Sequence, residues 1–523
     1  ITNILHFIYS ILVKVKLILC LFLMVLCYDM NAQIVRKGDF VFRSLFNSKE
    51  GRIIWSELAT AQWDTVSNKP NTCLFVNGTG MVNSTFDLTP YRGMRLTFRC
   101  RAKAENVTMP SIPYLGVKFM FHYKSVKGEF WKNEDNVFGT FDWKHLNFTA
   151  VIPDDVSVGD ISLGLQESTG KVWFDSISVK VKDLPVPHKK AKPISSNTKF
   201  RGVMSPMSVK ENDIRTLGLE WKANLIRWQI TMTSSENQWV DADINKYGRW
   251  IDKKLLETDS LLTICQKYGI KVVIDLHSVP GGRENNVVRL FYNKVYNDYF
   301  VNLWVKIAKR YKGNRAVWGY DLINEPVEGR EPPDGLDYYE TELKASKAIR
   351  AIDKLVPIIF EVNDWDSPSE FSFLKPIPVT HVIYEVHMYE PHTFTHQGVY
   401  DNSSGIAYPG VANEIKYDKT TLLKILQPVR VFQQTYNVPI YAGEFSAVRW
   451  APGAAQYMDD CISIFEEYGW NWTYHAYREW SGWDVEYENG RSKKDAPRKA
   501  TVDTDRKKVL LKWFQKNKSG ASR

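Results

Sequence analysis

Two glutamates in this sequence lie directly after short apolar runs. Glu325 belongs to the motif Asp-Leu-Ile-Asn-Glu-Pro at residues 321–326, and Glu444 belongs to Tyr-Ala-Gly-Glu-Phe at residues 441–445. A buried ionised carboxyl group is unfavourable without partners, so a single glutamate of this kind would indicate a salt-bridged strand end. Two of them form the pair that hydrolysis of a glycosidic bond requires: a neutral acid protonates the leaving oxygen, and a carboxylate attacks the anomeric carbon. We predict Glu325 and Glu444 as the catalytic residues.

Other polar and aromatic residues lie at or near the ends of further apolar runs. Arg227 could keep one of the two carboxyl groups ionised, while apolar neighbours raise the pKa of the other. Histidines in such positions favour a catalytic site over a purely structural interpretation. The predicted substrate-binding residues are Arg227, His277, Asn324, His387, Tyr389, His475 and Trp480.

The elements that must hold these residues alternate between strands and helices from Arg201 onward. Eight strands with intervening amphipathic helices predict a (β/α)8 barrel, or TIM barrel, in which catalytic side chains lie at the carboxyl ends of the strands. A doubly wound sheet would share this alternation, but no glycine-rich phosphate loop follows the first strand. The expected strands are residues 201–204, 224–230, 271–276, 317–323, 357–362, 381–387, 439–443 and 471–474, and the expected helices include 255–268, 299–311, 338–355 and 422–436.

A different pattern covers residues 33–181, where short alternating strands are separated by turn residues. This pattern predicts an all-β sandwich domain of the jelly-roll type. Residues 182–200 are rich in Pro, Lys and Ser and predict a linker, so that residues 201–523 form the barrel domain. A length of 523 residues also favours more than one domain.

Residues 1–32 are predicted to be a signal peptide. Lys14 and Lys16 precede the apolar run 17–27, and Ala32 supplies a small residue near the expected cleavage site. The run is shorter than the roughly 20 residues that a transmembrane helix needs. We therefore expect an exported protein that is secreted, periplasmic or held at the cell surface, and that meets the membrane only through this segment.

The composition and motifs exclude several other classes. Hydrophobic residues make up 44% and charged residues 24%, which excludes a disordered chain. The formal charge of +9 comes from scattered Lys and Arg without a nucleic-acid motif, so we expect no nucleic-acid partner. There is no Cys-x-x-Cys pair, and Pro391 indicates a loop around His392 and His396 rather than the helix that a zinc site would need. We expect no metal ion and no cofactor. A Ser-His-Asp hydrolase is disfavoured because no Gly-x-Ser-x-Gly motif occurs.

Residues 201–518 resemble glycoside hydrolase family 5, the cellulase-type retaining β-glycosidases. The Asn324-Glu325-Pro326 tripeptide is similar to the family's Asn-Glu-Pro and implies Glu325 as the acid/base and Asn324 as a donor to the sugar 2-hydroxyl. By the same resemblance Glu444 is the nucleophile. The remaining matches are Arg227 with the arginine near the nucleophile, His277 with the third-strand histidine, and His387 and Tyr389 with the sixth-strand pair.

One position departs from the family pattern. The family usually has a Trp at the end of the eighth strand, which stacks under the sugar, whereas this chain has His475 there and Trp480 five residues later. Either Trp480 takes over this role or the subsite is built differently. In the N-terminal domain, residues 168–175 resemble the closing strands of jelly-roll carbohydrate-binding modules.

These observations lead to a retaining endo-β-glycanase acting on a β-1,4-linked plant polysaccharide, as a monomer. The resemblance favours an endo-β-1,4-glucanase, or cellulase. The alternatives on the same barrel are a β-mannanase, a xyloglucanase and an exo-acting β-glycosidase. An alternative of another class is a glycan-binding protein without activity, against which the presence of both Glu325 and Glu444 speaks.

Overall fold

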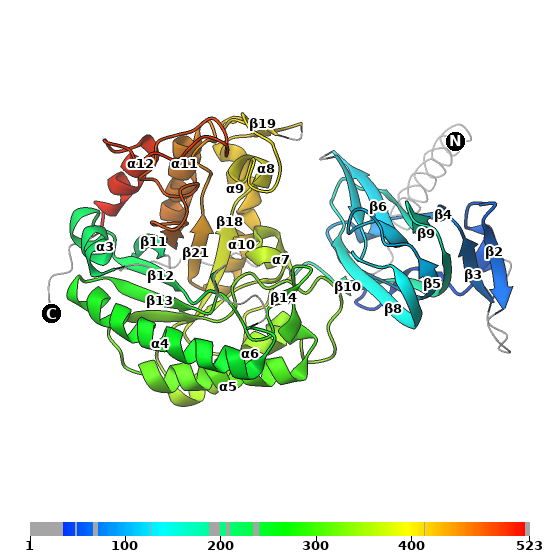
Figure 1. Cartoon of the computed structure of the whole chain (residues 1–523), viewed down its shortest axis with the longest axis horizontal. Helices are drawn as coiled ribbons and strands as arrows, with labels where there is room; N and C mark the ends of the chain where they lie inside the picture. Colours follow the sequence, from blue (N-terminus) through cyan, green and yellow to red (C-terminus); the bar gives the residue numbers. More distant parts are fainter. Residues whose placement is uncertain are drawn as a thin grey trace, which may run out of the picture. The chain divides into compact units, whose positions relative to one another are not determined.

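The chain is divided into two compact units (Figure 1). The computed structural model describes residues 35–47, 50–65, 72–126, 128–187, 199–205, 210–233, 240–412 and 414–517. The first unit, here called the β domain, comprises the described residues up to Ser125 together with Phe130–Leu146 and Ala150–Leu184. The second, here called the barrel domain, comprises Val126–Glu129, Asn147–Thr149 and the described residues from Pro185. The predicted signal peptide and residues 188–198 of the predicted linker lie outside the described residues.

The β domain consists of two antiparallel sheets. The larger sheet has the order β2-β3-β10-β5-β8, with β1 paired to β10, and the smaller sheet has the order β4-β9-β6-β7. Phe98 of the larger sheet packs against Phe121 of the smaller one with ring centroids 4.4 Å apart, so the inner faces share one core. This confirms the predicted all-β domain. Its elements are β1 (Phe40–Ser44), α2 (Glu50–Ile53), β2 (Ala61–Thr65), β3 (Thr72–Asn77), β4 (Gly80–Asp87), η1 (Thr89–Tyr91), β5 (Arg95–Val107), β6 (Gly116–Ser125), β7 (Gly128–Lys132), β8 (Gly139–Val151), β9 (Val158–Gln166) and β10 (Lys171–Asp183).

The barrel domain is built on a closed barrel of parallel strands in the order β11-β12-β13-β16-β17-β18-β21-β22. Each of the eight expected segments overlaps one of these strands, which confirms the predicted TIM barrel. The strands are β11 (Arg201–Ser205), β12 (Leu225–Gln229), β13 (Lys271–Asp275), β16 (Val317–Asp321), β17 (Ile358–Phe360), β18 (Val382–Met388), β21 (Ile440–Phe445) and β22 (Asn471–Tyr474). Short two-stranded sheets in the loops pair β14 (Arg283–Glu284) with β15 (Val287–Val288) and β19 (Gly410–Ala412) with β20 (Ile415–Tyr417).

The helices pack around the barrel, and most are longer or more divided than expected, whereas the expected helix 338–355 ends at Ile352. Helix α4 begins at Ile244, well before residue 255, because Asp243 caps it by accepting hydrogen bonds from the backbone of Asn245 and Lys246. The expected helix 422–436 is two helices that meet at Leu426. The helices are α3 (Glu211–Arg215), α4 (Ile244–Lys267), α5 (Lys294–Tyr311), α6 (Tyr338–Ile352), α7 (Asn363–Asp366), α8 (His392–Thr395), α9 (Lys419–Ile425), α10 (Gln427–Tyr436), α11 (Ala454–Tyr468) and α12 (Asp505–Phe514), with single turns η2 (Thr216–Glu220), η3 (Arg289–Phe291) and η4 (Pro368–Ser372).

The inside of the barrel consists of layers that change from apolar to charged towards the carboxyl ends of the strands. Because side chains alternate along a strand, inward-pointing residues repeat every two positions. The apolar layer contains Leu225, Val273, Ile359, Ile383 and Tyr441. Two residues further along four of these strands lie Arg227, Asp275, Glu361 and Glu385, all fully buried. On β21 the corresponding residue is Gly443, where an added Cβ would lie 1.3 Å from Glu385 Oε1.

Two cysteines lie in the helical layer of the barrel domain. Cys265 in α4 and Cys461 in α11 are fully buried, and burial raises the pKa of both thiols. No helix in the described part of the chain is long and apolar enough to cross a membrane.

Candidate active site

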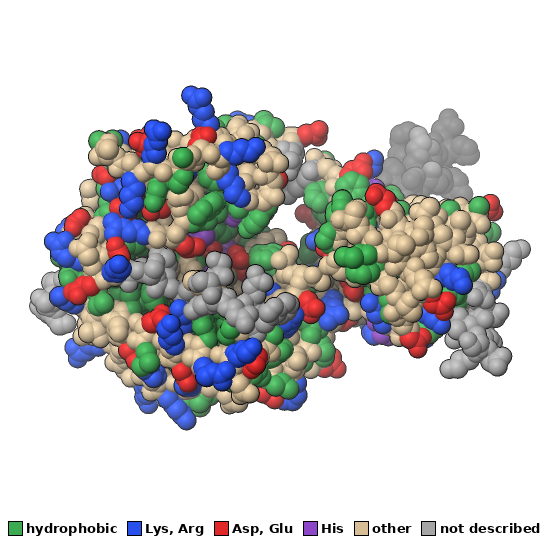
Figure 2. Space-filling view, viewed as in Figure 1, with side chains coloured by type: hydrophobic (Ala, Val, Ile, Leu, Met, Phe, Trp, Pro, Cys, Tyr) green, Lys and Arg blue, Asp and Glu red, His purple; other side chains and the backbone are tan. Residues whose placement is uncertain are grey.

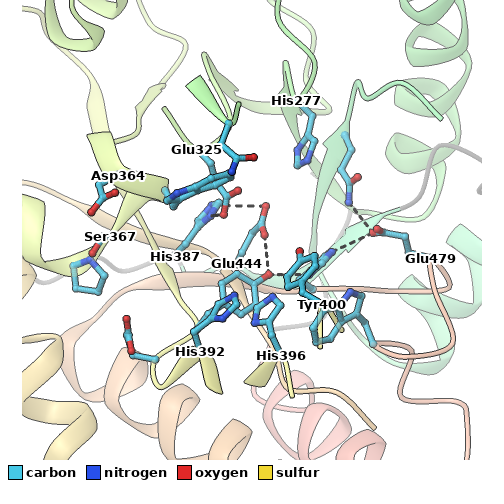
Figure 3. A pocket seen from close by; sticks show the side chains of 18 residues that line it. His277, Glu325, Asp364, Ser367, His387, His392, His396, Tyr400, Glu444 and Glu479 are labelled. Carbon is cyan, nitrogen blue, oxygen red and sulfur yellow. Dashed lines mark hydrogen bonds and ion pairs between the residues drawn. The ribbon is translucent and has the colours of Figure 1, made fainter. Parts of the chain in front are cut away.

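A pocket of about 820 Å³ opens at the carboxyl ends of the barrel strands (Figure 3). Gln229, His277 and His387 line it, each two residues beyond a member of the charged layer. The predicted residues Glu325, Tyr389, Glu444 and His475 line it as well. In the space-filling view, acidic and histidine side chains are visible in a hollow of this domain (Figure 2). Most of the site residues that were predicted from their positions at strand ends therefore line one pocket.

Glu444, at the end of β21, is held in its ionised form. Arg227 Nη1 donates a hydrogen bond to its Oε1 at 2.6 Å, and the Tyr389 hydroxyl donates to its Oε2 at 2.8 Å. Burial alone would raise the pKa of Glu444, but the positive charges of His387, His475 and Arg227 outweigh burial and hold this pKa well below its usual range. An ionised, oriented carboxylate is what a nucleophile at an anomeric carbon requires.

Glu325, just beyond β16, lies opposite Glu444 and is more open to the pocket. Its side chain is 20% exposed, against 7% for Glu444. Its backbone has a φ of 47°, in the left-handed region, and its N–H donates to Glu361 Oε2 at 2.7 Å. This hydrogen bond to Glu361, which follows β17, holds the backbone of Glu325 in place.

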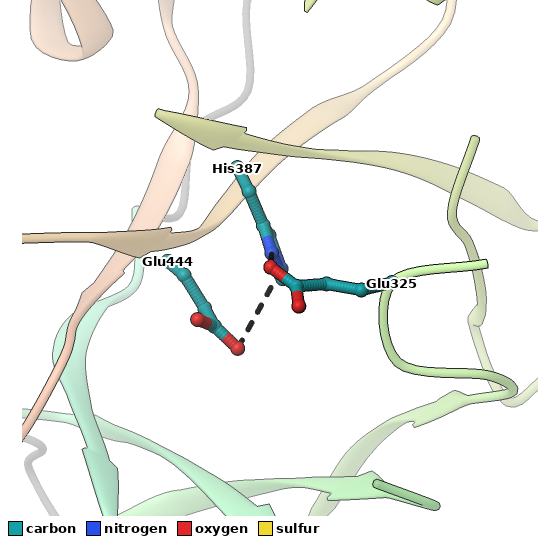
Figure 4. A group of neighbouring side chains, drawn as sticks. All are labelled: Glu325, His387 and Glu444. Carbon is teal, nitrogen blue, oxygen red and sulfur yellow. Dashed lines mark hydrogen bonds and ion pairs between the residues drawn. The ribbon is translucent and has the colours of Figure 1, made fainter. Parts of the chain in front are cut away.

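The two glutamates and His387 lie close together (Figure 4). One carboxylate oxygen of each glutamate and one ring nitrogen of His387 lie within 4.8 Å of one another. Retaining glycosidases have carboxyl groups about 5–5.5 Å apart, whereas inverting enzymes need roughly 6.5 Å or more to admit a water molecule. The short separation in this pocket suits direct attack by a carboxylate.

His387 supplies the positive charge that makes this separation tolerable. Its Nδ1 lies 3.0 Å from Glu325 Oε1, and its Nε2 lies 3.3 Å from Glu385 Oε1 and 3.8 Å from Glu444 Oε1. Burial would lower the pKa of His387, but Glu444, Glu325 and Glu385 together raise it well above its usual value. The imidazolium therefore donates hydrogen bonds to its carboxylate neighbours.

Arg227 connects the charged layer to the nucleophile. Its Nε donates to Asp321 Oδ2 at 2.8 Å and its Nη2 donates to Glu361 Oε1 at 2.8 Å, which leaves Nη1 for Glu444. Burial raises the pKa of Asp321 to about 6 and that of Glu385 to about 8. Protonation of part of this layer reduces its negative charge, so that the arginine remains available to the nucleophile.

The other predicted binding residues are placed around this centre. Asn324 does not line the pocket, but its Oδ1 accepts from Arg227 Nη2 at 3.1 Å, which orients its amide. His277 Nδ1 lies 2.9 Å from Asp275 Oδ2. Tyr389 is linked at its hydroxyl to His475 Nδ1, 2.8 Å away, as well as to the nucleophile.

Trp480 is another predicted site residue that does not line the pocket. It packs edge-on against Trp450 and Trp483, with ring centroids 5.9 Å and 5.5 Å away. Trp483 lines the pocket instead, with its ring 5.5 Å from that of His475. The backbone N–H of Trp483 donates to the carbonyl of Trp480 at 2.9 Å, so a turn separates the two indoles.

Several pocket residues were not predicted from the sequence. Trp365 follows the fifth strand, is 41% exposed, and has the Arg283 guanidinium 4.9 Å from its ring centroid. A search of every strand end, including the fifth, would have found its Asn-Asp-Trp-Asp motif. The other unpredicted lining residues include Gln229, Asp364, His392, His396, Tyr400, Glu479 and Trp483.

His392 begins the short helix α8 and His396 is the C-cap of that helix, so the pair does not lie in the expected loop. The two rings stack in parallel with centroids 4.0 Å apart, so their nitrogen lone pairs do not converge on one point. Burial lowers the pKa of His396 to about 3, which keeps it neutral. The combination Glu325, His387 and Glu444 has ligand-type atoms at metal-compatible distances, but a protonated His387 offers no lone pair. The donor set suits proton and glycosyl transfer better than metal binding.

The barrel domain is similar in sequence to known glycoside hydrolases. The family described as Cellulase (glycosyl hydrolase family 5) matches residues 188–481. Endoglucanase C of Acetivibrio thermocellus is 30% identical over 267 residues, covering 45% of this chain and 76% of that protein. Cellodextrinase A of Ruminococcus flavefaciens is 27% identical over 248 residues, covering 46% of this chain and 69% of that protein. Among solved structures, the endoglucanase Cel5A of Thermotoga maritima covers 60% of this chain and 96% of its own, with 22% identity and a TM-score of 0.46.

Proposed function

Because the chain belongs to glycosyl hydrolase family 5, the cellulase family, and is a glycoside hydrolase, we propose that it is a retaining endo-β-1,4-glucanase. The observation that carries this proposal is the pair Glu325 and Glu444, with carboxylate oxygens within 4.8 Å of each other across His387. This spacing and the ionised state of Glu444 support double displacement.

In the first step Glu444 attacks the anomeric carbon while Glu325, in its acid form, gives its proton to the leaving glycosidic oxygen. Arg227 and the Tyr389 hydroxyl hold the attacking carboxylate in place. The bond from the anomeric carbon to the leaving oxygen breaks, and a glycosyl ester with Glu444 forms. Asn324, with its Oδ1 held by Arg227, can turn its amide nitrogen to the sugar 2-hydroxyl.

In the second step Glu325, now a carboxylate, takes a proton from a water molecule that attacks the same carbon. The His387 imidazolium, 3.0 Å from Glu325, stabilises the carboxylate that this step needs. Glu444 leaves and regains its contacts with Arg227 and Tyr389. Two inversions at one carbon give a product that keeps the β-configuration.

The preference for glucan rests on the related proteins. Endoglucanase C and Cellodextrinase A are named for glucan-derived substrates, and this chain covers most of each of them. A reducing-sugar assay with carboxymethyl cellulose, barley β-glucan, mannan and xyloglucan tests the proposal. We expect the highest kcat/KM on a β-1,4-glucan and a rapid fall in viscosity, which is typical of internal cleavage. Mannan or xyloglucan as the best substrate, or release of single units without loss of viscosity, would contradict it.

We also propose that the enzyme acts outside the cytoplasm, because residues 1–32 have the pattern of a signal peptide, and that it is a monomer. Cell fractionation and gel filtration test this. Full-length enzyme confined to the cytoplasm, or a dimer at micromolar concentration, would contradict the respective part.

A further inference from the structure

The end of the eighth strand has a carboxylate where a sugar platform is expected. His475 occupies the position at which the family usually has a Trp, and Glu479, four residues later, also lines the pocket. Glu479 is therefore a pocket carboxylate in addition to Glu325 and Glu444, and the double-displacement mechanism has no role for it.

Glu479 is built into the pocket wall and is ionised. Gln229 Nε2 donates to its Oε2 at 2.9 Å, and His475 Nε2 lies 3.4 Å from the same oxygen. Burial would raise the pKa of Glu479, but His475 and Gln229 outweigh burial and lower it. Among the residues that the structure describes, no hydrogen bond to Glu479 Oε1 occurs, and the side chain is 31% exposed to the pocket. One oxygen is thus anchored and the other is available.

The position of Glu479 relative to the catalytic pair assigns it to one end of the substrate. Glu325 protonates the leaving oxygen, so the leaving part of the substrate lies on the side of Glu325. Figure 3 shows Asp364 on this side and Glu479 on the opposite side of Glu444, towards His277. Glu479 therefore faces the sugar units that stay on the enzyme after the first step, the glycone units.

We infer that Glu479 is a specificity-determining residue whose carboxylate binds hydroxyl groups of a neutral glycone sugar, in place of an aromatic platform. An indole face gives apolar contact with little demand on hydroxyl orientation, whereas an anchored carboxylate accepts hydrogen bonds from particular hydroxyls. A substrate without the right hydroxyl leaves this anion unpaired, and a glycone with its own carboxylate is repelled. The inference rests on the proposed retaining glucanase function.

The test compares Glu479→Gln with the parent enzyme on 4-nitrophenyl β-cellobioside and on analogues that each lack one glycone hydroxyl. For at least one analogue, we expect the parent to lose roughly 10–100-fold in kcat/KM, as for other hydrogen bonds to charged groups. We expect kcat/KM of Glu479→Gln on the complete substrate to be lower than that of the parent by a similar factor. Changing from the complete substrate to that analogue should then lower kcat/KM of Glu479→Gln by no more than about 3-fold. The matched control is Asp364→Asn, a pocket carboxylate on the side of Glu325, which should keep the parent's penalty for the same analogue.

Different outcomes separate the possible failures. Equal penalties for every analogue in the parent and in Glu479→Gln would overturn the inference, because Glu479 would then act only by positioning His475. If Glu479→Gln does not fold, Glu479→Asp is the second variant, because it keeps the negative charge but moves the carboxylate away from the sugar by the length of one methylene group. The same penalties for the analogues in Glu479→Asp as in the parent enzyme would likewise overturn the inference. A parent enzyme that cleaves mannan or another glycan but no β-glucoside contradicts the proposed glucanase. The same analogues of its own substrate then test Glu479.

Discussion

The His387 imidazolium has carboxylate neighbours at both ring nitrogens. Nδ1 faces Glu325, and Nε2 faces Glu385 and Glu444. Two carboxylates this close repel each other, and a shared cation offsets the repulsion without a metal ion. The roles of the two glutamates are then set by their other partners. Glu444 has Arg227 and Tyr389, whereas Glu325 is more exposed and can reach the leaving group.

Replacing each glutamate by alanine should give opposite products in the presence of azide. In Glu325→Ala the ester with Glu444 still forms from an activated aryl β-glucoside, and azide should attack it to give the β-glycosyl azide. In Glu444→Ala the ester cannot form, and any rescue should give the α-azide. Proton NMR of the product identifies the anomer, and the reverse result would exchange the two roles.

At the scale of elements, the alternation of side chains along the strands determines which residues line the pocket. Positions 225, 227 and 229 on β12 carry an apolar, a charged and a pocket residue in turn, and positions 273, 275 and 277 repeat this order from β13 onward. This period of two is visible in the sequence once the strands are recognised, which is why Arg227, His277 and His387 could be predicted. It also explains the charged layer beneath them.

The loops follow no such rule, and residues on them were harder to predict. The segment after β22 turns between Trp480 and Trp483, so that only the second indole reaches the pocket. After β17, residues Asp364 and Trp365 adopt left-handed backbone conformations that sequence periodicity does not signal. Side-chain direction in these loops depends on tertiary contacts such as that of Arg283 with Trp365.

Trp483 and Trp480 should therefore differ in their contributions. Trp483→Ala should lower kcat/KM on cello-oligosaccharides by about 10–100-fold, because it removes the indole beside His475. Trp480→Ala should mainly lower stability, by about 1–3 kcal/mol, since its ring packs on Trp450 and Trp483. Steady-state kinetics and thermal melts measured on both variants check this. A larger kinetic loss in Trp480→Ala than in Trp483→Ala would contradict this expectation.

The charged layer should make the barrel less stable as pH rises. Burial raises the pKa of Glu385 to about 8, so the folded state holds a proton that the unfolded chain loses near its ordinary carboxyl pKa. The native state then binds more protons than the unfolded state between these two pKa values, and the free energy of unfolding falls as pH increases through them. We expect the melting temperature to fall from pH 5 to pH 8.5 on the order of 5 °C.

Glu385→Gln should reduce this fall, because its amide carries no titrating proton. The exposed Glu467 on α11 provides a control, and Glu467→Gln should keep the full pH dependence. An identical pH dependence in Glu385→Gln and the parent would show that Glu385 does not titrate in this range.

At the scale of the whole molecule, the barrel domain is closed by contacts of its own. Glu466 on α11 accepts from Lys199 Nζ at 3.0 Å and from Arg201 Nε at 2.6 Å, and Arg201 Nη1 donates to Asn517 at 2.9 Å. These bonds join the start of β11 to the helical layer and to the last described residues. None of these bonds involves a residue before Lys199.

A fragment that starts at Lys199 should fold and cleave a soluble β-glucan with kcat/KM within about 3-fold of that of the whole chain. Circular dichroism and the reducing-sugar assay check this expectation. An insoluble or inactive fragment, with an active full chain, would show that the β domain supports the barrel. Glu466→Ala in the fragment should lower its melting temperature, since the contacts of this carboxylate with Lys199 and the buried Arg201 are lost.

The burial of Cys265 and Cys461 has a practical consequence for attaching the enzyme to other materials. These are the only cysteines between residues 201 and 523, and both thiols are enclosed and poorly ionised. Maleimide reagents should therefore leave the barrel fragment unmodified. A single cysteine introduced at Leu355, which is 74% exposed after α6, would then be the one reactive thiol. It lies next to the start of β17, at the end of the barrel away from the pocket, so a dye or a solid support can be coupled there while the substrate end stays open.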